Sequence, residues 1–549
     1  MLLVCAGLVT YANIFTNGLV WDDAGWMFFS PGVQPHFSLL QLFTTSGQHE
    51  AFYRPVFLTY LSLVGLLSQG NVFIIHLLQV SLHIANAVLV FFLFKKFLKE
   101  TGALFLALIF IVHPINVEAV TYMSAVGNVL AFTFGILGLH VLIRSRIRWH
   151  HSLFSGILVL LSLLTNETGI VWAGIVLAYI FLFKKVQIWN ALIFLISSVG
   201  IYALLRIVVG QTLIYTAGYV PIAHLTFIER MYTMPKILLF YLKTFFYPGY
   251  LSIAQHWVVR SINFADVVFP FILDVIFFAG IIAGGIYLKR RHAQLLAGYL
   301  FFVLWFLISM ALYLQIIPLD MTVADRWFYT PIIGMLGMIG VISQTFKIKP
   351  IFRVVGMLLL IGIIIGLSVR TMVRNNDWRD GLTLFSHDIR LNPDSFDIHV
   401  KFAGELSRAG RYDEALAHAQ RAVALEPDDI SSLGTLATLY IQGKQPQKAV
   451  VFLQKLITYD SNNYNGFTNL TYTLLLLNDN TSAKEYALDG LKHYANDPTL
   501  RLLLAIVQFR QGDSANALQN AQAANSALHN QNSNYVYTQI LNNQSIILE

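Results

Sequence analysis

The chain has 549 residues, of which 56% are hydrophobic and only 12% are charged. Soluble proteins carry roughly 25% charged residues, so the composition excludes an ordinary soluble enzyme and predicts an integral membrane protein. The net charge of +7 is better explained by membrane topology than by affinity for nucleic acid. Because Cys5 is the single cysteine, an internal disulfide is excluded.

About eleven apolar segments are long enough to be predicted as membrane spans. The first of them has no basic flank and no small-residue cleavage site, so we interpret it as a retained span rather than a signal peptide. Two further stretches, 55–69 and 231–247, are ambiguous, and we expect the second to lie in the interface or to re-enter the membrane. The predicted spans are 2–16, 72–94, 102–113, 127–143, 153–165, 168–183, 187–209, 268–288, 294–316, 328–346 and 351–370.

Basic residues cluster in five of the loops between these spans. With the spans above, all five clusters fall on one side of the membrane, which is cytoplasmic by the positive-inside rule. The loop after the first span and everything after residue 370 are therefore predicted to be exoplasmic. The clusters are Lys95-Lys96-Lys99, Arg144-Arg146-Arg148, Lys184-Lys185, Lys289-Arg290-Arg291 and Lys347-Lys349-Arg353.

The last third of the chain repeats. Four alanines, Ala415, Ala449, Ala483 and Ala517, are each 34 residues apart, and a small residue lies twelve positions before each of them. A 34-residue period with small residues at helix crossings predicts tetratricopeptide repeats, whose stacking forms a concave surface suited to extended peptides. We therefore predict an all-α protein, with a polytopic helix bundle over residues 1–373 and a repeat solenoid over residues 374–549. The tail after about residue 530, rich in Asn and Gln, is either a cap or partly disordered.

The acidic pair Asp22-Asp23 follows the first apolar segment on the predicted outer side. A carboxylate at the membrane surface can act as a general base toward a hydroxyl or as a metal ligand. The alternative is a solvated turn after a helix end, and the pair alone does not decide between them.

Three arginines on the same predicted side are candidates for binding an anionic headgroup or phosphate. Arg54 follows Tyr53 in an aromatic stretch, Arg206 lies near the outer end of its helix, and Arg326 opens another helix. The planar guanidinium can hold two phosphate oxygens. The alternative is a side chain that reaches the interface without a specific ligand.

Two glutamates also fall on the predicted outer side, one in each of two short polar stretches. Glu118 follows His113-Pro114, and Glu167 lies in Asn166-Glu167-Thr168-Gly169. Because a charged side chain is costly inside the bilayer, both are functional candidates, with a helix cap as the alternative for Glu167. His76, His83 and Asn86 lie roughly on one helix face, where we favour hydrogen bonding between helices over a proton relay.

Together these stretches resemble the transmembrane and tetratricopeptide-repeat (TMTC) O-mannosyltransferases. The resemblance covers nearly the whole chain and rests on the order of its motifs. These are Asp22-Asp23, Tyr53-Arg54-Pro55, the His76/His83/Asn86 helix, His113-Pro114 with Glu118, Asn166-Glu167 with Gly169, Arg326 to Pro331, and the junction from Asn376-Asp377-Trp378 to Asn392-Pro393.

The resemblance implies a GT-C fold glycosyltransferase that takes a sugar from a polyprenyl-phosphate donor on the exoplasmic side. That side is the periplasm or cell exterior in a bacterium and the lumen of the endoplasmic reticulum in a eukaryote. It implies that Asp22 or Asp23 is the base toward a Ser/Thr hydroxyl and that Arg54, Arg206 and Arg326 hold the phosphate. The two glutamates, Glu118 and Glu167, would orient substrates or assist a divalent cation, and Tyr53 and His113 would line the substrate site.

Three hypotheses follow. The first is a protein O-glycosyltransferase whose repeat groove binds the acceptor polypeptide. The second keeps the enzyme class but takes a cell-surface glycan or lipid as acceptor. The third is a membrane scaffold without activity, which the number of outer-side acidic and arginine positions argues against. The sugar, the metal and the choice between Asp22 and Asp23 stay open at this point.

Overall fold

The structure, a computed structural model, describes residues 1–26, 38–44, 52–143, 148–210, 220–346 and 349–548. These residues form helices and loops, with one isolated antiparallel bridge between Gln255 and Val323 and no extended strand. The chain divides into two compact units, Met1–Leu391 and Asn392–Glu549. The expected all-α class is confirmed.

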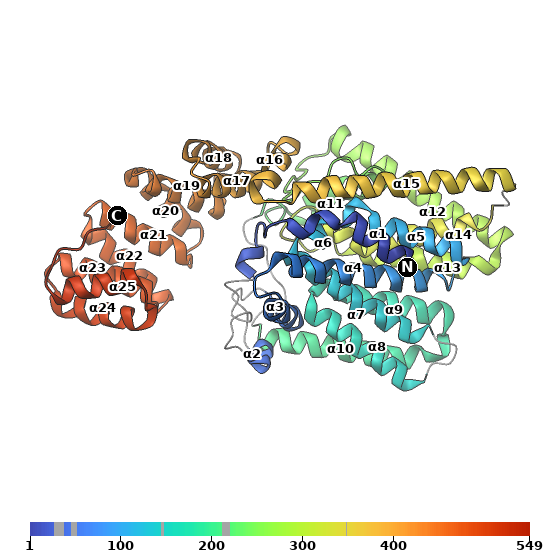
Figure 1. The fold of residues 1–549 in the computed structure, drawn as a ribbon, viewed down its shortest axis with the longest axis horizontal. Coiled ribbons are helices and arrows are strands. Elements are labelled where there is room, and N and C mark those ends of the chain that lie inside the picture. The colour runs from blue at the N-terminus through green and yellow to red at the C-terminus, as the bar shows by residue number, and fades with distance from the viewer. Residues whose placement is uncertain (27–37, 45–51, 144–147, 211–219, 347–348, 549) are drawn as a thin grey trace. The chain divides into compact units, whose positions relative to one another are not determined.

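The first unit is a bundle of mostly apolar helices (Figure 1). Short 3₁₀ turns connect several of them, among them η1 (Ala12–Thr16), η4 (Pro114–Asn116), η6 (Glu167–Gly169) and η9 (Asp325–Tyr329). The helices are α1 (Leu2–Thr10), α2 (Leu39–Thr44), α3 (Pro55–Ser68), α4 (Val72–Phe94), α5 (Glu100–Val112), α6 (Val117–Thr121), α7 (Val126–Leu142), α8 (Trp149–Thr165), α9 (Ile170–Phe183), α10 (Ile188–Val208), α11 (Phe227–Phe246), α12 (Phe269–Arg291), α13 (Ala293–Ala311), α14 (Pro331–Ser343), α15 (Pro350–Asp377) and α16 (Gly381–Leu391).

Within the described ranges, seven helical segments are long and apolar enough to cross a bilayer, which makes the chain a multi-pass membrane protein. An eighth span results if the pair 100–112 and 114–121, bent by 49°, is counted as one. Three shorter apolar helices cover 55–68, 149–165 and 167–183, so the expected number of about eleven spans is not confirmed. The seven segments are Val72–Phe94, Met123–Leu142, Ile188–Val208, Phe264–Arg291, Ala293–Ala311, Asp325–Ser343 and Ile351–Asp377.

The segment predicted as the first span is not one continuous helix. The α-helix ends at Thr10, and a 3₁₀ turn follows. In this stretch the Asn13 side chain donates to the Met372 carbonyl at 2.8 Å, and Asn17 donates to the Asn375 carbonyl at 2.9 Å. The break therefore lies where two asparagine side chains bind the backbone of another helix.

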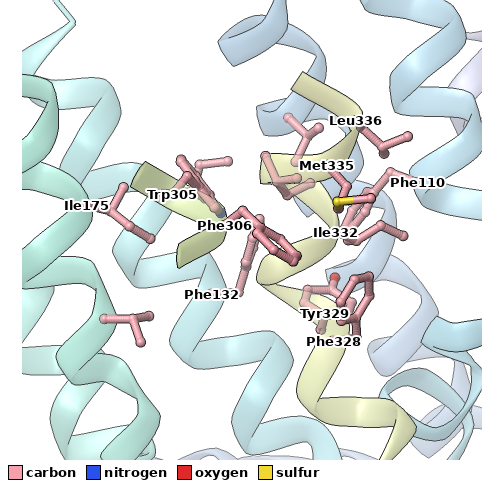
Figure 2. Packing of buried hydrophobic residues seen from close by; sticks show 14 of the residues in the cluster. Phe110, Phe132, Ile175, Trp305, Phe306, Phe328, Tyr329, Ile332, Met335 and Leu336 are labelled. Carbon is pink, nitrogen blue, oxygen red and sulfur yellow. The ribbon is translucent and has the colours of Figure 1, made fainter. Parts of the chain in front are cut away.

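Aromatic side chains fill the centre of the membrane unit. Figure 2 shows Phe132 in a group with Trp305, Phe306, Phe110 and Tyr329, and its ring centroid lies 6.0 Å from that of Phe110 and 5.2 Å from that of Tyr329. Tyr329 is also a hydrogen-bond partner, because its hydroxyl lies 2.8 Å from His83 Nδ1 and 3.2 Å from Asn86 Nδ2. His83 and Asn86 also hydrogen-bond to backbone carbonyls of neighbouring helices, so their predicted role in helix packing is confirmed.

The end of α15 is fastened to α16 by a buried ion pair. Arg374 donates two hydrogen bonds to the Asp388 carboxylate, at 2.7 and 3.0 Å, and the Ile253 amide donates to the same carboxylate at 2.9 Å. Both charged side chains are almost fully buried. We expected the repeat domain to begin at residue 374. That boundary stays a prediction. In the structure α15 continues to Asp377, and α16, which this ion pair joins to α15, lies in the first compact unit, Met1–Leu391.

The second unit consists of antiparallel helix pairs. The four alanines at 34-residue spacing are fully buried, and so are the small residues twelve positions before them, Ala403, Ala437, Thr471 and Ala505. The repeat period therefore marks the positions where helices pack closely. The Asn- and Gln-rich tail forms the last helix. The helices are α17 (Phe396–Arg408), α18 (Tyr412–Leu425), α19 (Ile430–Gln442), α20 (Pro446–Tyr459), α21 (Tyr464–Leu476), α22 (Asn480–His493), α23 (Pro498–Arg510), α24 (Ser514–Leu528) and α25 (Gln531–Leu541).

Replacing Asp388 by alanine is expected to destabilise the membrane unit by about 3–5 kcal/mol, because the buried Arg374 then keeps only the Asp377 carboxylate, at 3.3 Å, as a counter-charge. Burial raises the pKa of Asp388, but Arg374 and the other hydrogen-bond donors outweigh it and lower the pKa below its usual value. The contribution is thus present at neutral pH and lost as the pH falls through that lowered pKa. Thermal unfolding in detergent measures the change.

The matched control is Glu100→Gln, which removes an exposed ion pair to Lys95. Such a pair contributes about 0–1 kcal/mol. Equal losses for the two variants would contradict the structural role of Asp388.

Candidate active site

The two residues of the acidic pair have different surroundings. Asp23 is 1% exposed, and its carboxylate accepts hydrogen bonds from the Ser124 amide at 2.8 Å and the Ser124 hydroxyl at 2.7 Å. The Val20 and Met123 amides, each at 3.4 Å, complete a set of four donors. Asp23 therefore fastens the loop after η1 to the turn that precedes α7.

Burial raises the pKa of Asp23 to about 7, while the hydrogen bonds from Ser124, Val20 and Met123 act in the opposite direction. A carboxylate has to leave water to occupy this position, and four donors offset only part of that loss. Asp23 thus titrates near neutral pH.

Asp22, by contrast, is exposed. Its carboxylate accepts a hydrogen bond from the hydroxyl of the buried Tyr122 at 3.1 Å. Burial and the carboxylates of Asp22 and Asp23 raise the pKa of Tyr122, so the phenol stays protonated and donates. Among the residues that the structure describes, the other carboxylate oxygen of Asp22 has no hydrogen-bond donor.

The loop that carries Asp22 packs against a group of stacked aromatic rings. The Trp21 indole is stacked on Tyr122 with ring centroids 5.2 Å apart, and the far side of Tyr122 contacts the buried Trp378 at 5.4 Å. Trp21 has a φ of +60°, a left-handed conformation that bulky residues rarely adopt. Such strain often occurs at functional sites, where it fixes a neighbouring group. Sequence reasoning did not find Tyr122 or Ser124, because neither belongs to a recognisable motif.

Glu167 lies between two arginines. It accepts from Arg54 Nε at 2.7 Å with one carboxylate oxygen and from Arg206 Nη1 at 2.6 Å with the other. Arg206 is buried and also donates to the Tyr202 hydroxyl at 2.8 Å, whereas the Arg54 side chain is 24% exposed. The three groups carry a net charge of +1, which favours an anionic ligand next to Arg54.

The turn that carries Glu167 depends on a glycine. A Cβ at Gly169 would lie 2.6 Å from the Leu163 backbone nitrogen, so no larger residue fits where η6 folds back on α8. The sequence motif Asn166-Glu167-Thr168-Gly169 therefore has a steric reason. Asn166 supports it, accepting from the Thr168 amide at 3.0 Å.

Glu118 and Arg326 form a second ion pair, which is buried. One Glu118 oxygen accepts from the Arg326 guanidinium, and the other accepts from the Arg326 amide at 3.0 Å. Both oxygens are thus occupied, and the pair is electrically neutral. The predicted phosphate ligand Arg326 is less available than Arg54.

Tyr313 connects the two ion-pair clusters. It is stacked on Trp327 with centroids 5.2 Å apart. Burial raises the pKa of Tyr313, while a hydrogen bond with Thr168 and the charge of Arg326 act in the opposite direction. Thr168 follows Glu167, so Tyr313 lies between the Arg54–Glu167–Arg206 cluster and the Glu118–Arg326 pair.

Two other predicted substrate ligands have structural partners. The Tyr53 hydroxyl donates to the Phe43 carbonyl at 3.0 Å. His113 Nδ1 accepts from the Ile115 amide at 3.2 Å, which leaves Nε2 to donate to the Phe245 carbonyl at 3.0 Å. Both side chains are buried, so these contacts fix the loops around the site.

Among the residues that the structure describes, no group of three or more His, Cys, Asp or Glu side chains forms a set of metal ligands. We therefore assign no residue to a metal.

Comparison with known proteins finds relatives that are named as protein O-mannosyl-transferases. The protein O-mannosyl-transferase TMTC3 of Homo sapiens is 23% identical over 475 residues, which cover 78% of this chain and 51% of TMTC3. The Caenorhabditis elegans protein O-mannosyl-transferase F38B6.6 is also 23% identical, covering 78% of this chain and 62% of that protein. The chain thus spans about half the length of the human relative and somewhat more of the nematode one.

The repeat unit has its own matches. Residues 406–466 match a tetratricopeptide-repeat family model. Among solved structures, the repeat protein YrrB, described as having an unusual peptide-binding site, is 20% identical over 29% of this chain and 84% of YrrB, with a TM-score of 0.25.

An Asp23→Asn variant is expected to change how stability depends on pH. Because folding raises the pKa of Asp23 from about 3.9 to about 7, ionisation costs stability as the pH rises between these values, by at most about 1.4 kcal/mol per pH unit. Asparagine does not titrate, so the stability of the Asp23→Asn variant should fall less steeply than that of wild type from pH 4 to pH 7. Unfolding in detergent at several pH values measures this slope. Identical slopes for wild type and variant would show that Asp23 is ionised at an ordinary pKa.

Proposed function

We propose that this chain, which is similar to the TMTC proteins as its motifs predicted, is a membrane glycosyltransferase acting on protein hydroxyls. The donor is a sugar on a polyprenyl phosphate, and the names of the relatives favour mannose. The acceptor is a Ser or Thr side chain on the exoplasmic side. The observation that carries the proposal is the difference between Asp22 and the other three candidate carboxylates.

Asp22 is the general base in this proposal. Glu118 and Glu167 are engaged by arginines, and Asp23 is buried under four donors, whereas Asp22 is exposed and its carboxylate has a single described hydrogen bond. The free Asp22 oxygen takes the hydroxyl proton as the hydroxyl oxygen attacks the anomeric carbon. The bond from that carbon to the phosphate oxygen breaks, and its electron pair leaves with the lipid phosphate. Attack opposite the leaving group inverts the anomeric configuration.

The leaving phosphate binds at Arg54, with Arg206 behind it. Charge-assisted hydrogen bonds to a phosphate are strong, and a fixed positive group stabilises the charge that develops in the transition state. Glu167 holds both guanidinium groups in place, and the three side chains together carry a net charge of +1. The Glu118–Arg326 pair is neutral and next to Tyr122, so it orients the Asp22 loop and the acceptor rather than the phosphate.

The second unit presents the acceptor in this proposal. Tetratricopeptide arrays bind extended peptides on their concave surface. An unfolded or extended polypeptide is the form in which a Ser or Thr can reach a membrane-embedded site. The exoplasmic placement of this unit follows from the five basic loop clusters.

An Asp22→Asn variant is expected to lose transfer activity by about 10²–10⁴-fold, because the base contributes that much to such reactions. Its thermal stability should stay close to that of wild type, since Asp22 is exposed. The measurement is transfer from a radiolabelled polyprenyl-phosphate sugar to a Ser/Thr peptide by the purified full chain. Activity that survives in Asp22→Asn and disappears in a folded Asp23→Asn would reverse the assignment.

Cutting the chain after Leu391 tests the role of the repeats. The truncated protein keeps the Arg374–Asp388 pair and is expected to fold, but it should label protein acceptors at least tenfold less while still transferring to a short peptide at high concentration. A cut after Val373 removes that pair as well, so a loss of labelling there would not separate acceptor binding from folding. Undiminished labelling of proteins after the cut at Leu391 would remove the acceptor role from the repeats and favour a glycan or lipid acceptor.

A further inference from the structure

A cavity of about 330 Å³ lies in the membrane unit among the ends of α4, α7, α9 and α14 and the start of α13. Most of its lining residues are apolar or aromatic, but polar and apolar atoms contribute similar shares of its surface, and Lys96 and Gln294 supply polar side chains. The apolar lining consists of Phe97, Ile143, Tyr179, Phe183, Leu295 and Val341.

This cavity is distinct from the candidate active site. Two helices show the separation: α9 begins just after Glu167 and ends at Phe183, and α14 begins just after Arg326 and reaches Val341 near its end. At 1.5 Å rise per residue, the length of α9 separates the two sites by roughly 20 Å. The cavity therefore opens at the end of the bundle that carries Lys95-Lys96 and Lys184-Lys185.

The walls are fixed in place by ring packing. Phe97 contacts Phe183 at 5.6 Å and Phe301 at 5.5 Å between ring centroids. Gly298 is buried on one wall, and a Cβ there would lie 3.2 Å from the Phe97 ring. The missing side chain helps to keep the space open. Pre-formed apolar pockets with a few polar groups are typical of ligand sites.

The charge at the opening is positive and uncompensated. Lys96 is exposed and forms no ion pair with any described residue, whereas the adjacent Lys95 pairs with Glu100 at 3.1 Å. A basic residue beside an apolar slot between membrane helices matches an anionic headgroup attached to a hydrocarbon chain.

We propose that this cavity binds an anionic phospholipid. The phosphate lies against Lys96 and Gln294, and part of one acyl chain enters the space between Phe97, Tyr179 and Phe183. A zwitterionic lipid of the same chain length fits the slot equally well but adds a positive group next to the basic end. The charge of the headgroup therefore determines the preference for an anionic over a zwitterionic lipid. The cavity explains why the ligand needs an acyl chain. This inference does not depend on the proposed transfer reaction.

The test is native mass spectrometry of the full chain released from detergent with equal amounts of phosphatidylglycerol and phosphatidylcholine of matched chains. Wild type is expected to retain phosphatidylglycerol at least fivefold over phosphatidylcholine. Lys96→Gln should bring the ratio to within twofold, and Gly298→Leu, which fills the cavity, should reduce retention of both lipids. Lys95→Gln is the matched control and should behave as wild type.

A further measurement distinguishes binding of the headgroup phosphate alone from binding of the whole lipid. Glycerol 3-phosphate without acyl chains should neither be retained nor displace the lipid, because it leaves the cavity empty. Equal retention of the two lipids by wild type, or an unchanged ratio in Lys96→Gln, would overturn the proposal. Should Gly298→Leu fail to fold, the exposed Lys96→Gln variant still decides the question.

Discussion

The hydrogen bonds between residues 10–18 and the last turns of α15 determine where the candidate base lies. Thr10 contacts Ser368 at 2.6 Å, Asn17 donates to the Asn375 carbonyl, and the Gly18 amide donates to the Arg379 carbonyl at 2.9 Å. Each hydrogen bond contributes only about 0.5–1.5 kcal/mol, but together they fix the backbone that leads into the Asp22–Asp23 loop. Figure 1 shows α1 running beside α15, the long yellow helix. Trp378, at the end of that helix, then supports Tyr122, which in turn bonds to Asp22.

Charge compensation explains which carboxylates can react. Removing a carboxylate from water is costly, so buried ones need cations or several donors. Asp388 and Glu118 have arginines, Glu167 has two, and Asp23 has four hydrogen-bond donors. Asp22 is exposed, and its one described side-chain hydrogen bond comes from the Tyr122 phenol. The partners that make the other carboxylates structural also occupy the oxygens that a substrate would need.

The sequence predicted the features that depend on spacing. The 34-residue period located the alanines that are buried in the repeats. Arg54, Arg206 and Glu167 were candidate site residues from the sequence before the structure placed them in one cluster. It failed where tertiary contacts decide. The α1 break lies where asparagines bind α15, and the ion pair that joins α16 to α15 needs Asp388, 14 residues beyond Arg374. The roles of Tyr122 and Ser124 depend on which loop lies against Asp23, which no local pattern records.

The most direct test of this account is the anomeric configuration of the product. Purified full chain would be incubated with a polyprenyl-phosphate mannose of one defined anomer and a Ser/Thr peptide, and the linkage formed would be read by NMR. The account predicts a mannosylated hydroxyl with inverted configuration, because a single displacement with Asp22 as base forms no covalent sugar–enzyme intermediate. A retained configuration, or no product with an intact and folded protein, would contradict it.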